Sequence, residues 1–158
     1  MATPPEFDAA AAHRYFAAHC FNSAWPLIDK AERTPEEETQ LLALGHASLW
    51  HWTQRADCTD KSLSVGHWML SRIYSVLREP AGARRYAESC LRMSGRPLVE
   101  PFYLAFAHEA VARAAALRED WATVSTSLRA ARELAEQVAD PANRKLLLDD
   151  LSTVRAGA

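Results

Sequence analysis

The sequence predicts an all-α protein, built as a stack of antiparallel helical hairpins with about seven or eight helices. Only five glycines occur among the 158 residues, and no stretch shows the alternating pattern of a β-strand. Ala, Leu, Arg and Glu dominate, and these residues favour helices. Composition and pattern therefore both point to helices throughout the chain.

Prolines and capping residues mark where the helices begin. Thr34-Pro35-Glu36-Glu37 combines an N-cap threonine, a proline in the first helical position and a glutamate three residues after the cap, which is a capping box. Asp140-Pro141 and Glu79-Pro80 open helices in a similar way, and Pro101 belongs to another first turn. We expect helices at residues 6–20, 23–32, 35–55, 60–78, 81–94, 101–118, 120–138 and 141–154, joined by loops short enough to make neighbours antiparallel.

Length, composition and charge describe an ordinary cytoplasmic domain spanning residues 1–158. A hydrophobic content of 49% is enough for a core, and 18 basic against 20 acidic residues give a net charge of −2, which disfavours nucleic acid as a partner. No signal peptide or stretch of about 18 apolar residues is present, so no membrane association is expected. The three cysteines lie outside any CxxC pair and are expected to be reduced packing thiols: Cys20, Cys58 and Cys90.

Three stretches place a histidine in the same apolar setting: LALGHASLWH (42–51), LSVGHWMLSR (63–72) and LAFAHEAVAR (104–113). At about 100° per residue, the leucine, the histidine and the following apolar residue fall within one stripe about 60° wide. We expect this stripe, with its histidine, to face neighbouring helices. The last residue of each stretch and the residue four before it share a different face of the helix.

Residues 63–90 match residues 104–131 at an offset of 41. Small and apolar positions align in both halves of the match, as do the histidines and the arginines: Gly66/Ala107, His67/His108, Leu70/Val111, Ser71/Ala112, Arg72/Arg113, Ala83/Val124, Ala87/Leu128 and Cys90/Ala131. A self-match of this length and spacing indicates a helical-hairpin repeat.

These residues resemble the tetratricopeptide-repeat family, including its small bacterial members. Leu70, Ser71 and Tyr74 fit the first helix of that repeat, and Ala83, Ala87 and Cys90 fit the second. The offset of 41 departs from the family's 34 residues, and neither unit has the usual closing proline. The match is best over residues 60–138. The helix at 141–154 is then a cap, which we expect to keep a polar outer side.

The resemblance implies a concave groove lined by Trp68, Arg72, Glu109, Arg113 and His51. We therefore expect a non-catalytic protein-binding or scaffold module with a protein or peptide partner. Replacing Arg72 and Arg113 with alanine should weaken partner capture and leave the thermal midpoint nearly unchanged. No asparagine lies at the positions that clamp a peptide carboxylate in some family members, which weakens that particular interpretation. Within a single helix, Glu109 and Arg113 could also simply pair with each other.

A second hypothesis concerns His46, His67 and His108. They could line a site for a transition metal such as zinc, or perform acid/base chemistry on a small molecule. The favoured interpretation is that each histidine is a packing residue that hydrogen-bonds to a neighbouring helix. The specific motifs of phosphate-binding loops, zinc proteases and serine hydrolases are absent. A non-catalytic module without a cofactor is therefore the leading expectation, and the histidine site stays the alternative.

The run Trp50-His51-Trp52 covers most of a helix circumference. It indicates either a helix packed on several sides, or an aromatic pocket wall or dimer contact. Because the N-terminal half is rich in aromatic residues, we expect a homodimer through the first three helices, with Trp25 and Trp50 in its interface.

Overall fold

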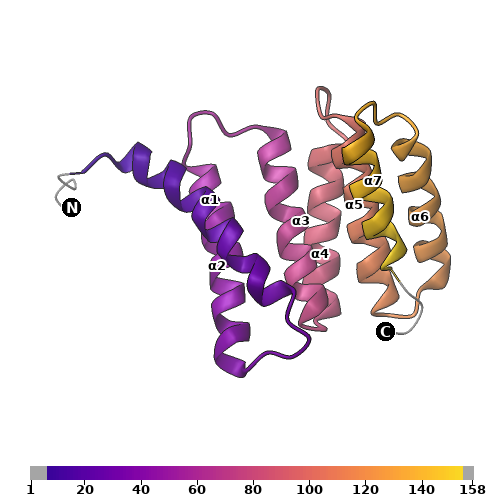
Figure 1. Ribbon diagram of the computed structural model, residues 1–158, viewed down its shortest axis with the longest axis horizontal. Coiled ribbons are helices and arrows are strands. Elements are labelled where there is room, and N and C mark those ends of the chain that lie inside the picture. The colour runs from indigo at the N-terminus through magenta and orange to yellow at the C-terminus, as the bar shows by residue number, and fades with distance from the viewer. Residues whose placement is uncertain (1–6, 155–158) are drawn as a thin grey trace. The chain divides into compact units, whose positions relative to one another are not determined.

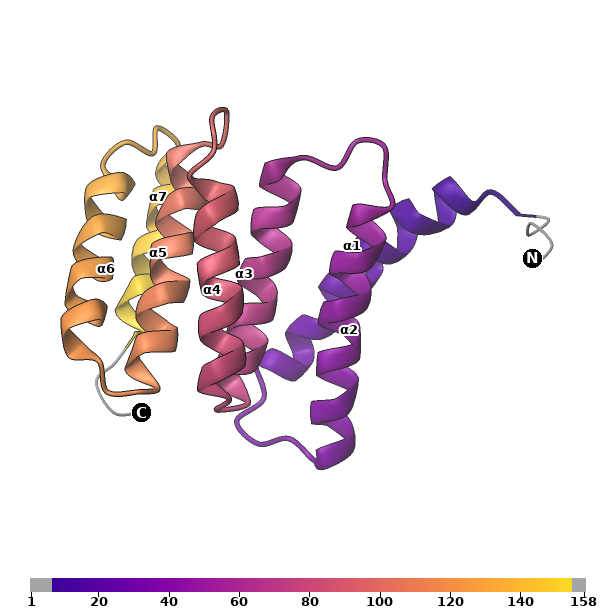
Figure 2. The same ribbon diagram turned by 180° about the vertical axis from the view of Figure 1, so that it is seen from behind.

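The computed structural model describes residues 7–154, and every regular element in that range is a helix (Figures 1 and 2). The predicted all-α fold is confirmed. The chain divides into two compact units, residues 1–59 and 60–158. The first unit contains α1 (Ala9–Ile28) and α2 (Pro35–Thr53). The second contains α3 (Asp60–Val76), α4 (Pro80–Ser94), α5 (Pro101–Ala116), α6 (Trp121–Ala135) and α7 (Pro141–Ser152).

Helix α1 is continuous where the sequence predicted two helices, at 6–20 and 23–32. Asn22 and Ser23 do not break it, and Pro26 lies inside its last turns. Its buried residues recur every three or four positions across the expected break, at Ala17, Cys20, Ala24 and Ile28. This unbroken apolar stripe packs along α2. The prediction was wrong because tertiary packing outweighs the local preference of two polar residues.

Helix α2 begins at the predicted capping box. The Thr34 N–H donates to Glu37 Oε2 at 3.0 Å, and the Glu37 N–H donates to Thr34 Oγ1 at 3.3 Å. Further along, the buried Ser48 hydroxyl donates to the Ala17 carbonyl of α1 at 2.8 Å. Most residues buried between α1 and α2 have small side chains. The core of this helical hairpin is therefore small.

The second unit contains the predicted repeat as two helical hairpins, α3/α4 and α5/α6. The first helix of each hairpin ends on a left-handed residue, at Arg78 and Glu119, both with a φ of 57°. The next N–H then donates back to the helix, from Glu79 to Tyr74 O at 2.9 Å and from Asp120 to Ala115 O at 3.1 Å. Positions 41 residues apart therefore have the same backbone geometry.

Small residues let the helices of these hairpins approach closely. Four aligned pairs are buried on both sides of the match: Gly66/Ala107, Ser71/Ala112, Ala83/Val124 and Cys90/Ala131. Gly82 in α4 lies directly against the ring of Tyr74, where an added Cβ would be 2.3 Å from a ring carbon. The contact between α3 and α4 thus requires a residue without a Cβ at position 82.

Helix α7 caps the second unit, against α5 and α6 (Figures 1 and 2). The side chain of Asp140 accepts from the Asn143 N–H at 2.7 Å and starts the helix. Leu147 and Leu151 enter the core formed by residues of α5 and α6. The outer side is less polar than the sequence predicted, because Leu146 and Leu148 are exposed there. Only two of the four leucines of α7 can face the core at the same time.

Candidate functional site

A buried carboxylate lies between α3 and α5. Glu109 has no exposed surface, and it accepts hydrogen bonds from N–H groups of three side chains. Its Oε2 accepts from the Trp68 indole N–H at 2.9 Å. Its Oε1 accepts from Arg113 Nε at 2.6 Å and from Arg72 Nη2 at 3.3 Å. A carboxylate that is shielded from solvent needs such partners, because an uncompensated buried charge is strongly unfavourable.

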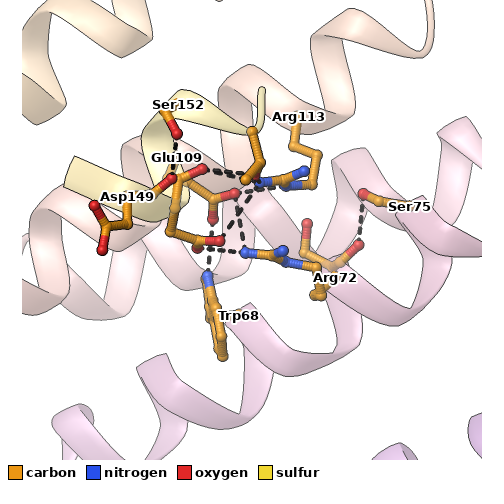
Figure 3. A network of polar contacts seen from close by, with 10 residues as sticks. Trp68, Arg72, Ser75, Glu109, Arg113, Asp149 and Ser152 are labelled. Atoms are coloured by element: carbon orange, nitrogen blue, oxygen red, sulfur yellow. Dashed lines mark hydrogen bonds and ion pairs between the residues drawn. The ribbon is translucent and has the colours of Figure 1, made fainter. Parts of the chain in front are cut away.

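The repeat explains why these four side chains meet. Trp68 and Arg72 are one turn apart on α3, and Glu109 and Arg113 occupy the equivalent positions on α5. Residues four apart share one face of a helix, so packing α3 against α5 brings the two pairs together (Figure 3). The Arg72 guanidinium also lies over the Trp68 ring, 5.3 Å from its centroid. The predicted neighbourhood of these four residues is present.

Helix α7 contacts the same two arginines. Arg72 Nη2 donates to Asp150 Oδ2, and Arg113 Nη2 donates to Thr153 Oγ1 at 2.7 Å. Arg113 also lies 3.8 Å from Asp150 Oδ1 and 3.5 Å from the Asp150 carbonyl. Each arginine therefore joins the buried Glu109 to the C-terminal end of α7.

This arrangement changes the interpretation of the two arginines. The sequence predicted that alanine could replace them without loss of stability. Their side chains are instead largely buried and compensate the charge of Glu109, and removing one partner of such a pair is typically destabilising. We therefore expect alanine at these positions to destabilise the protein, because Glu109 lies in the interior. Sequence spacing does not reveal this burial. The pairing of Glu109 with Arg113 within α5 is confirmed.

A small cavity of about 120 Å³ lies beside Arg113, at the end of α7. Its walls come from the last turns of α3 and α5 and from the chain after α7: Ser75, Val76, Arg113, Ala116, Leu117, Thr153 and Val154. One side is thus provided by a guanidinium group and a hydroxyl group that bond to each other. The polar cluster is therefore adjacent to open space.

His67 and His108 are half-buried in the second unit. Burial lowers the pKa of both, and for His67 the nearby Arg92 lowers the pKa further. The His67 ring stacks on Tyr86, with centroids 6.0 Å apart. These two residues follow the predicted packing stripe.

His46 does not follow that stripe. It is exposed on α2, whereas Gly45 and Ser48 beside it are buried. The prediction was wrong here because the helix presents its smallest residues to α1, which turns the histidine outwards. Across residues 7–154, no group of three or more His, Cys, Asp or Glu side chains is placed to hold a metal ion.

His51, the fifth residue of the predicted groove, lies in the first unit. Its Nδ1 is 2.8 Å from Nδ1 of His13 on α1, and its ring contacts Phe16 and Trp50. Burial and the neighbouring His13 lower the pKa of His51. Because Trp50 is 54% exposed, the interpretation of a helix packed on all sides is wrong. His13 was not predicted as a partner of His51, although its spacing from Phe16 in α1 was a usable signal.

Within residues 7–154, none of the three cysteines forms a disulfide. Cys20 and Cys90 are buried and Cys58 is half-buried. Burial raises the pKa of Cys90 to about 11, so the thiol form is strongly favoured at neutral pH. A packing role fits this environment.

Fold and site together define a class: an all-α protein whose second unit pairs two helical hairpins around a buried, arginine-compensated carboxylate. Comparison of the chain with models of protein families, with curated proteins and with solved structures finds no match. The resemblance to the tetratricopeptide-repeat family therefore stays a prediction. None of the helices between residues 7 and 154 is long and apolar enough to cross a bilayer.

Proposed function

We propose that the protein is a non-catalytic, cytoplasmic protein-binding module of the tetratricopeptide type, and that its partner binds beside Arg72 and Arg113. One observation carries the proposal. Glu109 orients these two arginines, and both of them contact the Asp150 carboxylate of α7. The same chemistry suits a helix of another protein.

Charge and shape both support this surface. Guanidinium groups make directional bonds to carboxylates and hold them better when other contacts fix the guanidinium plane. Glu109 and Trp68 provide that fixation here. The adjoining cavity at Ala116 and Leu117 provides apolar wall next to the polar cluster.

Site-specific photo-crosslinking tests the proposal. A photoreactive residue at Ala116, in the cavity wall, is compared in living cells with one at Arg129, an exposed position on α6. We expect a discrete crosslinked partner from position 116, with a yield at least five times that from position 129. Equal yields from both positions, or none from position 116, would count against the surface.

We further propose that the protein forms a homodimer through its first unit. Tyr15, Phe16 and Trp50 are 60%, 41% and 54% exposed, and such an aromatic patch is typical of interfaces. Trp25, the other predicted interface residue, is half-buried. Light scattering at micromolar concentration should give twice the chain mass of 17.6 kDa, and Trp50→Ser should restore the monomer. A monomeric wild type would refute the dimer.

A further inference from the structure

The face of α7 that packs against the rest of the second unit is short and has a simple pattern. Leu147 and Leu151 are buried, and Asp150 and Thr153 bond to the arginines. These four positions correspond to the pattern Leu-x-x-Asp-Leu-x-Thr. Leu147, Asp150 and Leu151 lie on one face of the helix, because they are spaced by three and four residues from Leu147. Thr153 follows as the C-cap residue.

The site that receives this face has an unbalanced charge of its own. Arg72 and Arg113 contribute two positive charges and Glu109 contributes one negative charge, so Asp150 brings the fourth member that neutralises the cluster. An apolar or basic helix would leave a partly buried positive charge uncompensated. The occupant must therefore present an acidic group at the position of Asp150.

Other features of α7 fit an occupant that can be exchanged. The helix has 12 residues, and helices of this length are marginal without tertiary contacts. Two of its leucines, Leu146 and Leu148, remain exposed on the outer side. Beyond Thr153 the cavity at Arg113 offers additional room.

We propose that the Arg72–Arg113 surface recognises an amphipathic acidic helix of the pattern Leu-x-x-Asp-Leu-x-Thr, and that α7 occupies this surface as an intramolecular competitor. The inference rests on the proposed function and names its partner class and its regulation. A partner helix must displace α7, whose local concentration is high because it belongs to the same chain. Weakening α7 then strengthens partner binding.

The test uses the full chain and a fluorescent synthetic peptide of residues 139–154. Asp150→Asn in the chain removes the carboxylate from α7 and leaves both arginines and Glu109 in place. Asp149→Asn is the matched control, because Asp149 is exposed and pairs with Lys145 within the helix. We expect the Asp150→Asn chain to bind the peptide at least tenfold more tightly than the wild type does, and the Asp149→Asn chain to match the wild type.

The peptide itself provides the second arm. A peptide that itself carries Asp150→Asn should bind the Asp150→Asn chain without the tenfold increase in affinity. Equal binding of the native peptide to all three chains, or equal binding of both peptides, would overturn the proposal. If the Asp150→Asn chain fails to fold by circular dichroism, Thr153→Val replaces it, with a smaller gain of about threefold expected from the lost hydroxyl.

The two proposals fail in different ways. A partner crosslinked from position 116 together with an absent peptide gain would retain the binding surface and reject α7 as competitor. A peptide gain without any crosslinked partner would retain the intramolecular contact and reject the protein-binding function.

Discussion

Arg78 and Glu119 have the same backbone conformation, with a φ of 57° at positions 41 residues apart. Each closes the first helix of a hairpin. Neither is glycine, although the left-handed backbone conformation at both positions favours glycine. Both side chains are exposed, so neither contributes to a core. The repeat thus tolerates local strain at the same turn twice.

Glycine at either position should therefore stabilise the second unit. Arg78→Gly or Glu119→Gly removes the Cβ clash of a left-handed residue, and we expect a gain of about 0.5–1 kcal/mol in the free energy of unfolding. Urea denaturation measures it. As a control, Gly at exposed Arg129 inside α6 should cost about 1 kcal/mol. A loss of stability at both turn positions would contradict this account.

Replacing Glu109 with glutamine should destabilise the protein by about 3 kcal/mol, because two largely buried guanidinium groups then lose their shared counter-ion. Thermal and urea unfolding provide the measurement. Lys145→Gln breaks only an exposed ion pair and should change little. If both variants unfold at the same urea concentration as the wild type, Glu109 does not support the cluster.

Gly82→Ala reverses the usual effect of this substitution in a helix. Alanine normally stabilises a helix interior, but its Cβ would meet the Tyr74 ring at 2.3 Å. We expect a loss of about 1–3 kcal/mol, as for an overpacked core. The double variant Gly82→Ala/Tyr74→Ala should be no less stable than the single variant Tyr74→Ala. A Gly82→Ala variant more stable than the wild type would show that the ring moves aside freely.

Acidification should weaken the second unit through His67. Burial lowers the pKa of His67 in the folded protein below its ordinary value of about 6.5, so the unfolded chain binds the proton more readily. The contribution of His67 is complete above pH 6.5 and is lost as the pH falls towards the folded-state pKa. Between pH 7.5 and pH 5.0, His67→Phe should lose less stability than the wild type in urea titrations. Identical profiles for His67→Phe and the wild type would remove His67 as the cause.

Local signals in the sequence were sufficient for most helix boundaries. Pro35, Pro101 and Pro141 begin helices as predicted, because a proline in the first turn and a capping side chain act within four residues of each other. The offset of 41 likewise identified the equivalence of Arg72 with Arg113. Both kinds of information are contained in short segments of the chain.

The candidate site needed the tertiary structure. The sequence brought Trp68, Arg72, Glu109 and Arg113 into one group, but it predicted an open groove where Glu109 is in fact buried. It also could not reveal Asp150, which is 78 residues from Arg72. Whether a charged side chain is buried depends on helices far away in the chain, and the spacing within its own helix does not record them. For the same reason α1 continues through Asn22 and Ser23, while His46 turns outwards although it shares its motif with His67 and His108. Sequence alone determined the helices and their repeat, and packing decided which of their faces became interior.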